Sequence, residues 1–159
     1  MRSTAVIVLG VSSLAIAAAH AQQVPSGWEA VVPQGMAGSY ERNRYAPAVR
    51  IGNLVFVSGV IGYERGSNNG PAAQFERAFR RLEGVLAGAG LAMANVAEIT
   101  TYHVNLGELG RPFITIKDRF FPRAPFPAWT AIGVERLFLD SALVEIRATA
   151  VSPPPRAGQ

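Results

Sequence analysis

Cysteine is absent from all 159 residues, and histidine occurs only at positions 20 and 103. A chain with so few soft ligands cannot build a Cys/His zinc site or a multi-histidine transition-metal site by itself. It has no cysteine nucleophile, and it contains no G-x-S-x-G elbow, P-loop or glycine-rich dinucleotide motif. We therefore expect no metal, no organic cofactor and a core that forms without disulfides.

Lysine is almost as scarce, because Lys117 is the only lysine among 15 basic residues, which stand against 11 acidic ones. The resulting net charge of +4 does not by itself imply a nucleic-acid partner. Arg77, Arg80 and Arg81 gather on one predicted helix. They could contact phosphate, or they could form a solvated face paired with neighbouring glutamates. The mixed charges favour the solvated face, and we expect no nucleic acid.

The first 21 residues have the layout of a secretory signal peptide. Arg2 supplies the positive charge, an apolar run occupies 5–19, and Ala19-His20-Ala21 forms a small-x-small cleavage site. The run is short and rich in alanine for a membrane span, which needs about 20 strongly apolar residues. An uncleaved anchor is the alternative. Cleavage before Gln22 would leave 138 of the 159 residues as a periplasmic or secreted protein with no membrane partner.

The remaining sequence predicts one domain with flexible ends. Residues 22–39 are polar and rich in glycine and proline, which predicts a flexible N-terminal arm. Residues 152–159 begin with Ser-Pro-Pro-Pro and predict a disordered tail. The domain lies between them at 40–151, and a chain of this size buries about two-thirds of its unfolded surface.

Apolar patterning predicts that strands and helices alternate in this domain. The predicted strands are rich in β-branched residues and cover 50–57, 99–106, 130–134 and 143–151. A helix begins at Pro71 and ends near Gly90, and a shorter one opened by Gly110 and Pro112 ends at Pro122. This order predicts an α/β (α+β) fold with one sheet and two helices packed on one face. The other face keeps apolar residues that copies of the chain could cover.

Three separated motifs resemble the RidA (YjgF) superfamily. They are Y-A-P-A-V-R-I-G-N-L-V-F-V-S-G at 45–59, an amphipathic helix and strand within 74–106, and P-A-W-T-A-I-G-V followed by L-V-E-I within 127–146. The resemblance covers about residues 40–151. It implies a chorismate-mutase-like fold with a single mixed sheet, a homotrimer, and three ligand clefts between neighbouring subunits. The best-known members hydrolyse reactive enamines and imines, and others are reported as ribonucleases.

The resemblance also implies roles for individual residues. Glu145 matches the glutamate thought to position the attacking water. Trp129 stands where deaminating members have the arginine that holds the substrate carboxylate, and a tryptophan cannot grip an anion through two parallel hydrogen bonds. The other substrate-binding candidates are Tyr45, Ser58, Gly59, Thr130, Ala131 and Arg147.

Several of these residues keep a second interpretation. Arg147 lies two residues after Glu145 on the same strand face, where it either supplies the missing positive charge or pairs with Glu145. Trp129 could simply fill the cleft, and Glu145 could serve a structural salt bridge. His103 is either a general base or a hydrogen-bonded structural residue.

The sequence thus predicts an exported, hydrolase- or deaminase-like protein that acts on a small imine-, amine- or carbonyl-containing metabolite. It does not predict an efficient 2-imino acid deaminase, because Trp129 replaces the arginine. A non-catalytic trimeric small-molecule-binding protein is the alternative. A ribonuclease is the third hypothesis, and it would require a connected basic surface with exposed aromatic rings.

Overall fold

The computed structural model describes residues 27–153, so the predicted signal peptide and residues 154–159 of the predicted tail lie outside it. This range forms six strands, three α-helices and one short 3-10 helix. In chain order they are β1 (Trp28–Val31), α1 (Ala37–Asn43), β2 (Ala48–Ile51), β3 (Leu54–Ile61), α2 (Pro71–Gly88), the 3-10 helix (Met93–Asn95), β4 (Val96–Val104), α3 (Leu106–Phe120), β5 (Ala128–Val134) and β6 (Val144–Val151).

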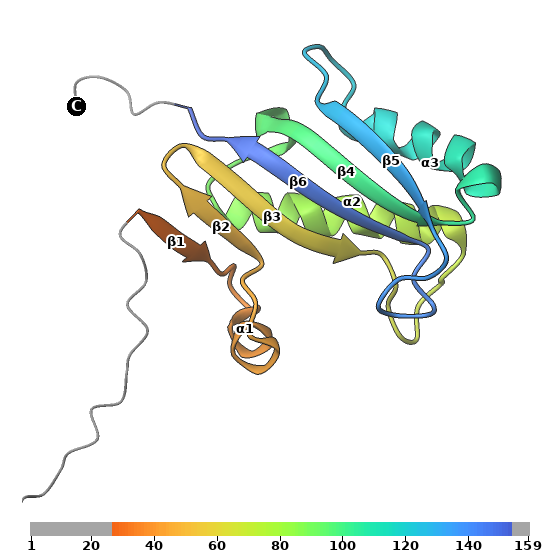
Figure 1. Ribbon diagram of the computed structural model, residues 1–159, viewed down its shortest axis with the longest axis horizontal. Coiled ribbons are helices and arrows are strands. Elements are labelled where there is room, and N and C mark those ends of the chain that lie inside the picture. The colour runs from red at the N-terminus through yellow and green to blue at the C-terminus, as the bar shows by residue number, and fades with distance from the viewer. Residues whose placement is uncertain (1–26, 154–159) are drawn as a thin grey trace, which may run out of the picture.

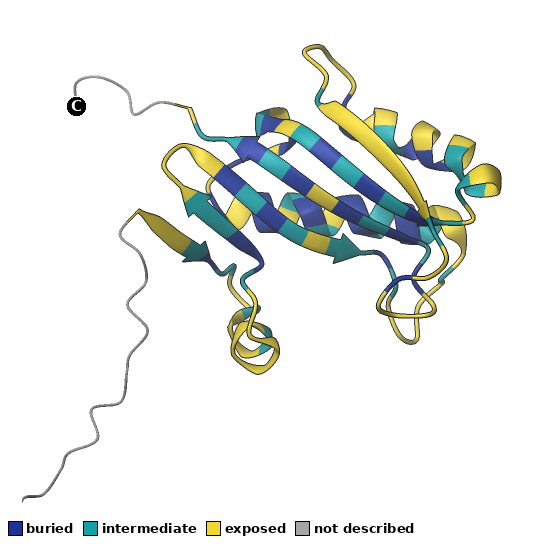
Figure 2. Cartoon of the chain, viewed as in Figure 1, coloured by how far each residue is buried: buried dark blue, intermediate teal, exposed yellow. Residues whose placement is uncertain are grey.

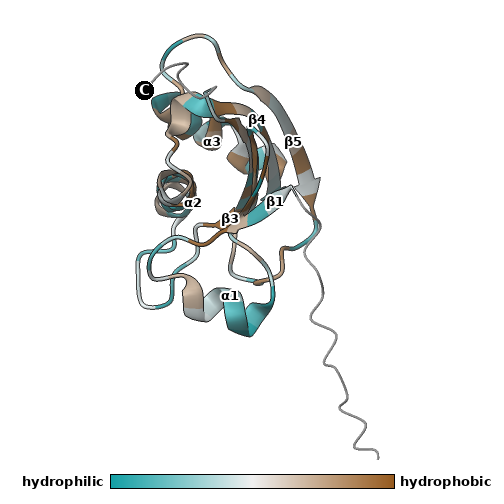
Figure 3. Ribbon diagram, turned by 90° about the vertical axis from the view of Figure 1, so that its left-hand side faces the viewer, coloured by the Kyte–Doolittle hydropathy of each residue, from teal (hydrophilic) through white to brown (hydrophobic). Residues whose placement is uncertain are grey.

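All six strands belong to one sheet in the order β1-β2-β3-β6-β4-β5 (Figure 1). Neighbouring strands are antiparallel except β4 and β5, which are parallel because α3 carries the chain back between them. Helices α2 and α3 lie on one side of the sheet, and α1 lies beyond its end (Figure 3). The predicted fold class, a single mixed sheet with helices on one face, is therefore confirmed.

The core lies between the sheet and the two long helices. Burial alternates along β4 and β6, as strands with one packed face require (Figure 2). Phe79 of α2 is fully buried, and its ring stacks on that of Phe120 of α3 at 4.7 Å. Burying one such side chain contributes about 1.5–3 kcal/mol. Phe79→Ala would leave a cavity and cost about 3–5 kcal/mol.

Helix α2 ends as its sequence predicts, whereas α3 begins earlier than predicted. Gly90 has a φ of 72°, and the Leu91 N–H donates to the Leu86 carbonyl at 2.9 Å, which forms a Schellman cap. Helix α3 begins at Leu106, so Pro112 lies inside the helix and does not open it. The proline was a misleading start signal, because one missing N–H bond is tolerated in a helix that α2 and the sheet pack against.

Two further expectations were wrong. The predicted flexible arm at 22–39 contains β1, which pairs with β2, and the start of α1. The single strand predicted over 50–57 is a hairpin of β2 and β3, because Gly52 adopts a φ of 59° and turns the chain between Ile51 and Leu54. Both corrections add a strand at the same edge of the sheet, where the sequence contains only short apolar runs.

Candidate functional site

Glu145 lies on the sheet face opposite α2 and α3, which none of the helices within residues 27–153 covers (Figure 3). Its neighbours across the strands are Tyr102 of β4 and Ile61 of β3. The ladder between β3 and β6 is interrupted at Ser58 and Gly59 by a β-bulge. A Cβ atom added to Gly59 would overlap Oε1 of Glu145. A larger residue at position 59 would therefore force the Glu145 side chain out of its present position beside the bulge.

Tyr45, Ser58 and Gly59, three of the substrate-binding candidates, lie close together at this bulge. They line a small hollow of about 40 Å³ between α1 and β3. The Ser58 hydroxyl donates to the carbonyl of Ala46 at 2.7 Å, which ties the segment before β2 to β3. Tyr45 is 53% exposed, so its ring is available to a second molecule. Glu145 does not line this hollow but lies next to Gly59 at its edge, and we refer to these four residues as the Glu145 half-site.

Trp129 and Ala131 lie on the opposite face of the sheet from Glu145. They pair with Ile99 and Thr101 of β4, which are fully buried on the helix side. The Cα atoms of Trp129 and Glu145 are about 14 Å apart, given two strand spacings and three residues of offset. Thr130 alternates to the uncovered face beside Thr100. One chain therefore does not unite Trp129 with Glu145.

A buried hydrogen-bond network holds the Trp129 ring. Its Nε1–H donates to Thr101 Oγ1 at 2.9 Å, and the same oxygen lies 2.8 Å from His103 Nε2. The Thr101 hydroxyl donates in turn to the Thr130 carbonyl at 3.3 Å. If His103 carries its proton on Nε2, all these groups are satisfied, and only the Nδ1 lone pair lacks a partner among the described residues. This tautomer is assigned from the bonding pattern.

His103 is a structural residue by this geometry. It is fully buried, and its ring packs edge-on against Phe113 at 4.5 Å. Burial lowers the pKa of His103 from 6.5 to about 4, so the ring is neutral near pH 7. It lines neither the hollow at Gly59 nor the pocket beside Trp129. The general-base interpretation is therefore the weaker one.

A larger pocket of about 550 Å³ lies beside Trp129, between the start of β5 and the end of α3. It is lined by Ile99, Lys117, Asp118, Phe121, Pro122, Phe126, Pro127 and Trp129. The ammonium group of Lys117 lies 4.9 Å from the centre of the Trp129 ring. It also donates to Asp118 Oδ1 at 2.6 Å.

Sequence reasoning missed this pocket. The only available signal was that the one lysine of the chain lies next to Ile116, within the apolar stripe of α3. Nothing in the pattern placed Lys117 against Trp129, because the two residues meet only when α3 packs over β5.

Arg147 lies exposed on the uncovered face, as the strand alternation predicts. Within residues 27–153 no ion pair joins it to Glu145. The expected pairing of these two side chains is therefore not present in one chain. Arg147 faces Thr100 of β4, two residue pairs along the ladder from Glu145 and Tyr102.

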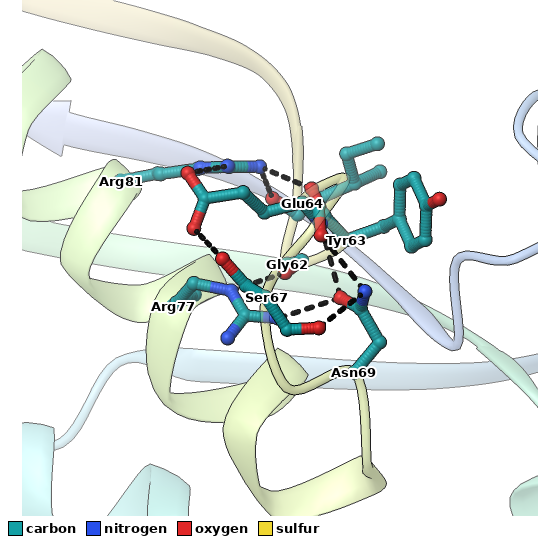
Figure 4. Close-up of polar contacts among 8 residues, drawn as sticks. Gly62, Tyr63, Glu64, Ser67, Asn69, Arg77 and Arg81 are labelled. Carbon is teal, nitrogen blue, oxygen red and sulfur yellow. Dashed lines mark hydrogen bonds and ion pairs between the residues drawn. The ribbon is translucent and has the colours of Figure 1, made fainter.

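The helix arginines have structural partners. Arg77 donates to the Gly62 carbonyl at 2.8 Å, and Arg81 donates to the carbonyls of Ile61 and Tyr63 at 2.8 and 2.9 Å (Figure 4). These bonds fix the loop after β3 on α2. Arg80 is more exposed and forms ion pairs with the glutamates one turn away on either side. This arrangement agrees with a solvated, paired face.

Residues 27–153 contain neither a cluster of metal-binding side chains nor a helix that could span a membrane. No three His, Cys, Asp or Glu side chains gather there in a way that could hold a metal ion. None of the helices in this range has the length and apolar character needed to cross a membrane.

Comparison with known proteins identifies the family. A family model described as Endoribonuclease L-PSP matches residues 38–152. RutC family protein YjgH of Escherichia coli K12 is 35% identical over 107 residues, which is 66% of this chain and 82% of YjgH. A 2-iminobutanoate/2-iminopropanoate deaminase of Dermatophagoides farinae is 32% identical over 111 residues, which is 67% of this chain and 84% of the deaminase.

Solved structures agree with the sequence match. The structure of protein YJGH matches with a TM-score of 0.69 at 32% identity, and the match covers 80% of this chain and 98% of the YJGH chain. Rv2704 of Mycobacterium tuberculosis, from the YjgF/YER057c/UK114 family, has a TM-score of 0.67 at 31% identity and covers 78% and 98%. The sheet order, the motifs and these matches together show that the chain belongs to the RidA (YjgF) superfamily.

Proposed function

We propose that this protein is an exported, homotrimeric hydrolase of the deaminase type that cleaves the C=N bond of a small imine-containing metabolite. The observation that carries the proposal is the Glu145 carboxylate beside the bulge at Gly59, on a face left open by the fold. A carboxylate next to a β-bulge on an accessible sheet face can orient a water molecule toward a bound electrophile. Related chemistry is named for the Dermatophagoides relative.

The active cleft would form between two copies of the chain. The half-site at Glu145 and the half-site at Trp129 lie on opposite faces of one sheet. The uncovered face also exposes one large apolar side chain on each of four strands, namely Trp28, Ile51, Leu54 and Ile132. Covering them is favourable by roughly 25 cal/mol per Å². A neighbouring subunit that covers this face would also bring its own β5 edge toward Glu145.

The reaction requires only a carboxylate, a water molecule and groups that hold the substrate. Glu145 would accept a hydrogen bond from water, direct the water oxygen to the imine carbon and take up a proton as the C–O bond forms. The nitrogen would take that proton to give the neutral carbinolamine. Glu145 would then pass the hydroxyl proton to the same nitrogen as the C–N bond breaks, so that ammonia leaves and a carbonyl product remains. Main-chain groups at Ser58 and Ala131 would hold the reacting group, and Trp129 would form the cleft wall.

Small 2-imino acids would be poor substrates of this cleft. The deaminating members hold the substrate carboxylate with an arginine, and Trp129 offers one N–H that already donates to Thr101. A carboxylate placed there would lack the arginine, which costs about 2–5 kcal/mol in a partly desolvated site. The Lys117 ammonium group beside the Trp129 ring is already paired with Asp118.

The test compares Glu145→Gln with Glu98→Gln, a matched control on the same sheet face. Glu98 accepts hydrogen bonds from Thr100 and Thr149. It lies four residues along β4 from Tyr102, the residue that pairs with Glu145. Imines are generated from a panel of amino acids and amines by oxidases, and their disappearance is followed with semicarbazide. We expect Glu145→Gln to lose turnover by at least about a hundredfold and Glu98→Gln to keep it.

Two outcomes would contradict the proposal. If the parent turns over none of the panel but binds members of it, and Glu145→Gln binds equally well, the protein is a trimeric binding protein. Equal losses in both variants would show that any carboxylate on this face supports folding or assembly rather than the reaction.

A further inference from the structure

The pocket beside Trp129 has a volume far larger than a small imino acid needs. Its volume of about 550 Å³ falls in the range of pockets that enclose ligands of drug size, roughly 300–1,000 Å³. A four-carbon imino acid, with about seven non-hydrogen atoms, would leave most of this space empty. The pocket therefore has room for a ligand with a larger body.

The walls of the pocket indicate an aromatic body. Trp129 and Phe126 are 36% and 66% exposed, so both rings present surface to the pocket. Phe121 and two prolines complete an apolar lining. Aromatic rings stack in offset or edge-on geometry on such walls, and each pair contributes beyond its buried area. The network through Thr101 fixes the Trp129 ring in place before any ligand arrives.

The pocket has one cation, Lys117, which is paired with Asp118 and keeps donors for an anionic ligand. The Lys117 side chain is only 16% exposed, and its ammonium group lies between the Trp129 ring and Asp118. An ammonium group has three donors, and Asp118 accepts one of them. The other donors remain for an anionic ligand, and the partial burial of Lys117 strengthens such a contact relative to an exposed ion pair.

We propose that this pocket binds an aromatic carboxylate, with its ring on Trp129 and Phe126 and its carboxylate on Lys117. This inference deepens the proposed function, because Trp129 borders both the pocket and the cleft. It assigns Lys117 as the residue that selects anionic ligands in a chain whose cleft lacks the arginine. Asp118 competes with the ligand for the same ammonium group.

The experiment is calorimetric titration of the mature protein with three probes. They are 2-naphthoate, its neutral isostere 2-naphthamide, and 2-oxobutanoate as a small carboxylate. We expect 2-naphthoate to bind at least about tenfold more tightly than either comparator, because one charge-assisted hydrogen bond and one stacked ring distinguish it from them.

Variants at two adjacent residues should change the affinity in opposite directions. Lys117→Met keeps the aliphatic stem and should remove the preference for naphthoate over naphthamide. Asp118→Asn removes the competing carboxylate and should tighten naphthoate binding by a few-fold. A role of Lys117 in packing alone would not produce this reversal. If Lys117→Met fails to fold, Lys117→Arg retains the charge and should retain the preference.

Each result decides the question. Equal affinity for naphthoate and naphthamide, no binding of naphthoate, or an unchanged preference in Lys117→Met would overturn the inference. Glu145 does not line this pocket. Naphthoate binding without turnover of any imine would therefore refute the proposed hydrolysis and leave this inference standing, and turnover without naphthoate binding would do the reverse.

Discussion

Acid should destabilise this protein through one buried residue, His103. Its ring is fully buried, and burial lowers its pKa to about 4, whereas the unfolded chain has the ordinary value of 6.5. Between these two values the unfolded state binds a proton that the folded state does not bind. The contribution of neutral His103 to stability is therefore complete above pH 6.5 and is lost as the pH falls toward 4.

The magnitude follows from the two pKa values. The full difference is worth about 3 kcal/mol, at 1.36 kcal/mol per pKa unit. Lowering the pH from 7 to 5 should remove about 2 kcal/mol of that contribution. Below pH 4 the ring is protonated in both states, so this group causes no further loss.

Urea unfolding at pH 7 and pH 5 measures the effect, at a fixed protein concentration because assembly also contributes to apparent stability. His103→Gln cannot titrate, and it retains all carboxylates of the parent. We expect the parent to lose about 2 kcal/mol more than His103→Gln over this interval. Equal losses in the two proteins would refute the assignment of His103 as a buried neutral residue.

Three further predictions concern the site and export. The parent should hydrolyse 2-iminobutanoate roughly 30- to 4,000-fold more slowly than an arginine-bearing relative, and Trp129→Arg should raise that rate; parental turnover within about tenfold would contradict this. Gly59→Ala should displace the Glu145 carboxylate and lower turnover with little change in urea unfolding, whereas Gly84→Ala, with open space at its Cβ, should leave turnover unchanged and be neutral or stabilising. Sequencing the N-terminus after expression should begin at or near Gln22, and intact Met1 would argue against cleavage.

The fold could be predicted from the sequence where a local pattern is compatible with a single secondary structure. The stripe of α2 predicted its buried face, and Gly90 predicted its end, because φ near 70° is open to glycine without strain. The N-terminal edge was harder to predict. Residues 28–31 form a short edge strand whose conformation depends on pairing with β2, and that pairing leaves little trace in local composition.

Some features of the candidate site could likewise be predicted from local sequence, and others depend on tertiary packing. Strand alternation placed Glu145 and Arg147 on one face, and the substrate-binding candidates Tyr45, Ser58 and Gly59 lie close together at the bulge. The separation of Trp129 from Glu145 was not predictable, because it follows from the parallel pairing of β4 and β5. Nor was the contact of Lys117 with Trp129, which depends on how α3 packs across the sheet edge.

The central claim is that two copies of the chain bring Glu145 and Trp129 into one cleft, and cross-linking tests it most directly. Because the chain has no cysteine, Glu145→Cys and Trp129→Cys each introduce a single thiol. The two variants, with different tags, are co-expressed and treated with a short bis-maleimide. We predict a cross-linked pair that carries both tags, and no pair from either variant expressed alone. A mixed sample that yields no such pair, or a parent that light scattering shows to be a stable monomer, would contradict the claim.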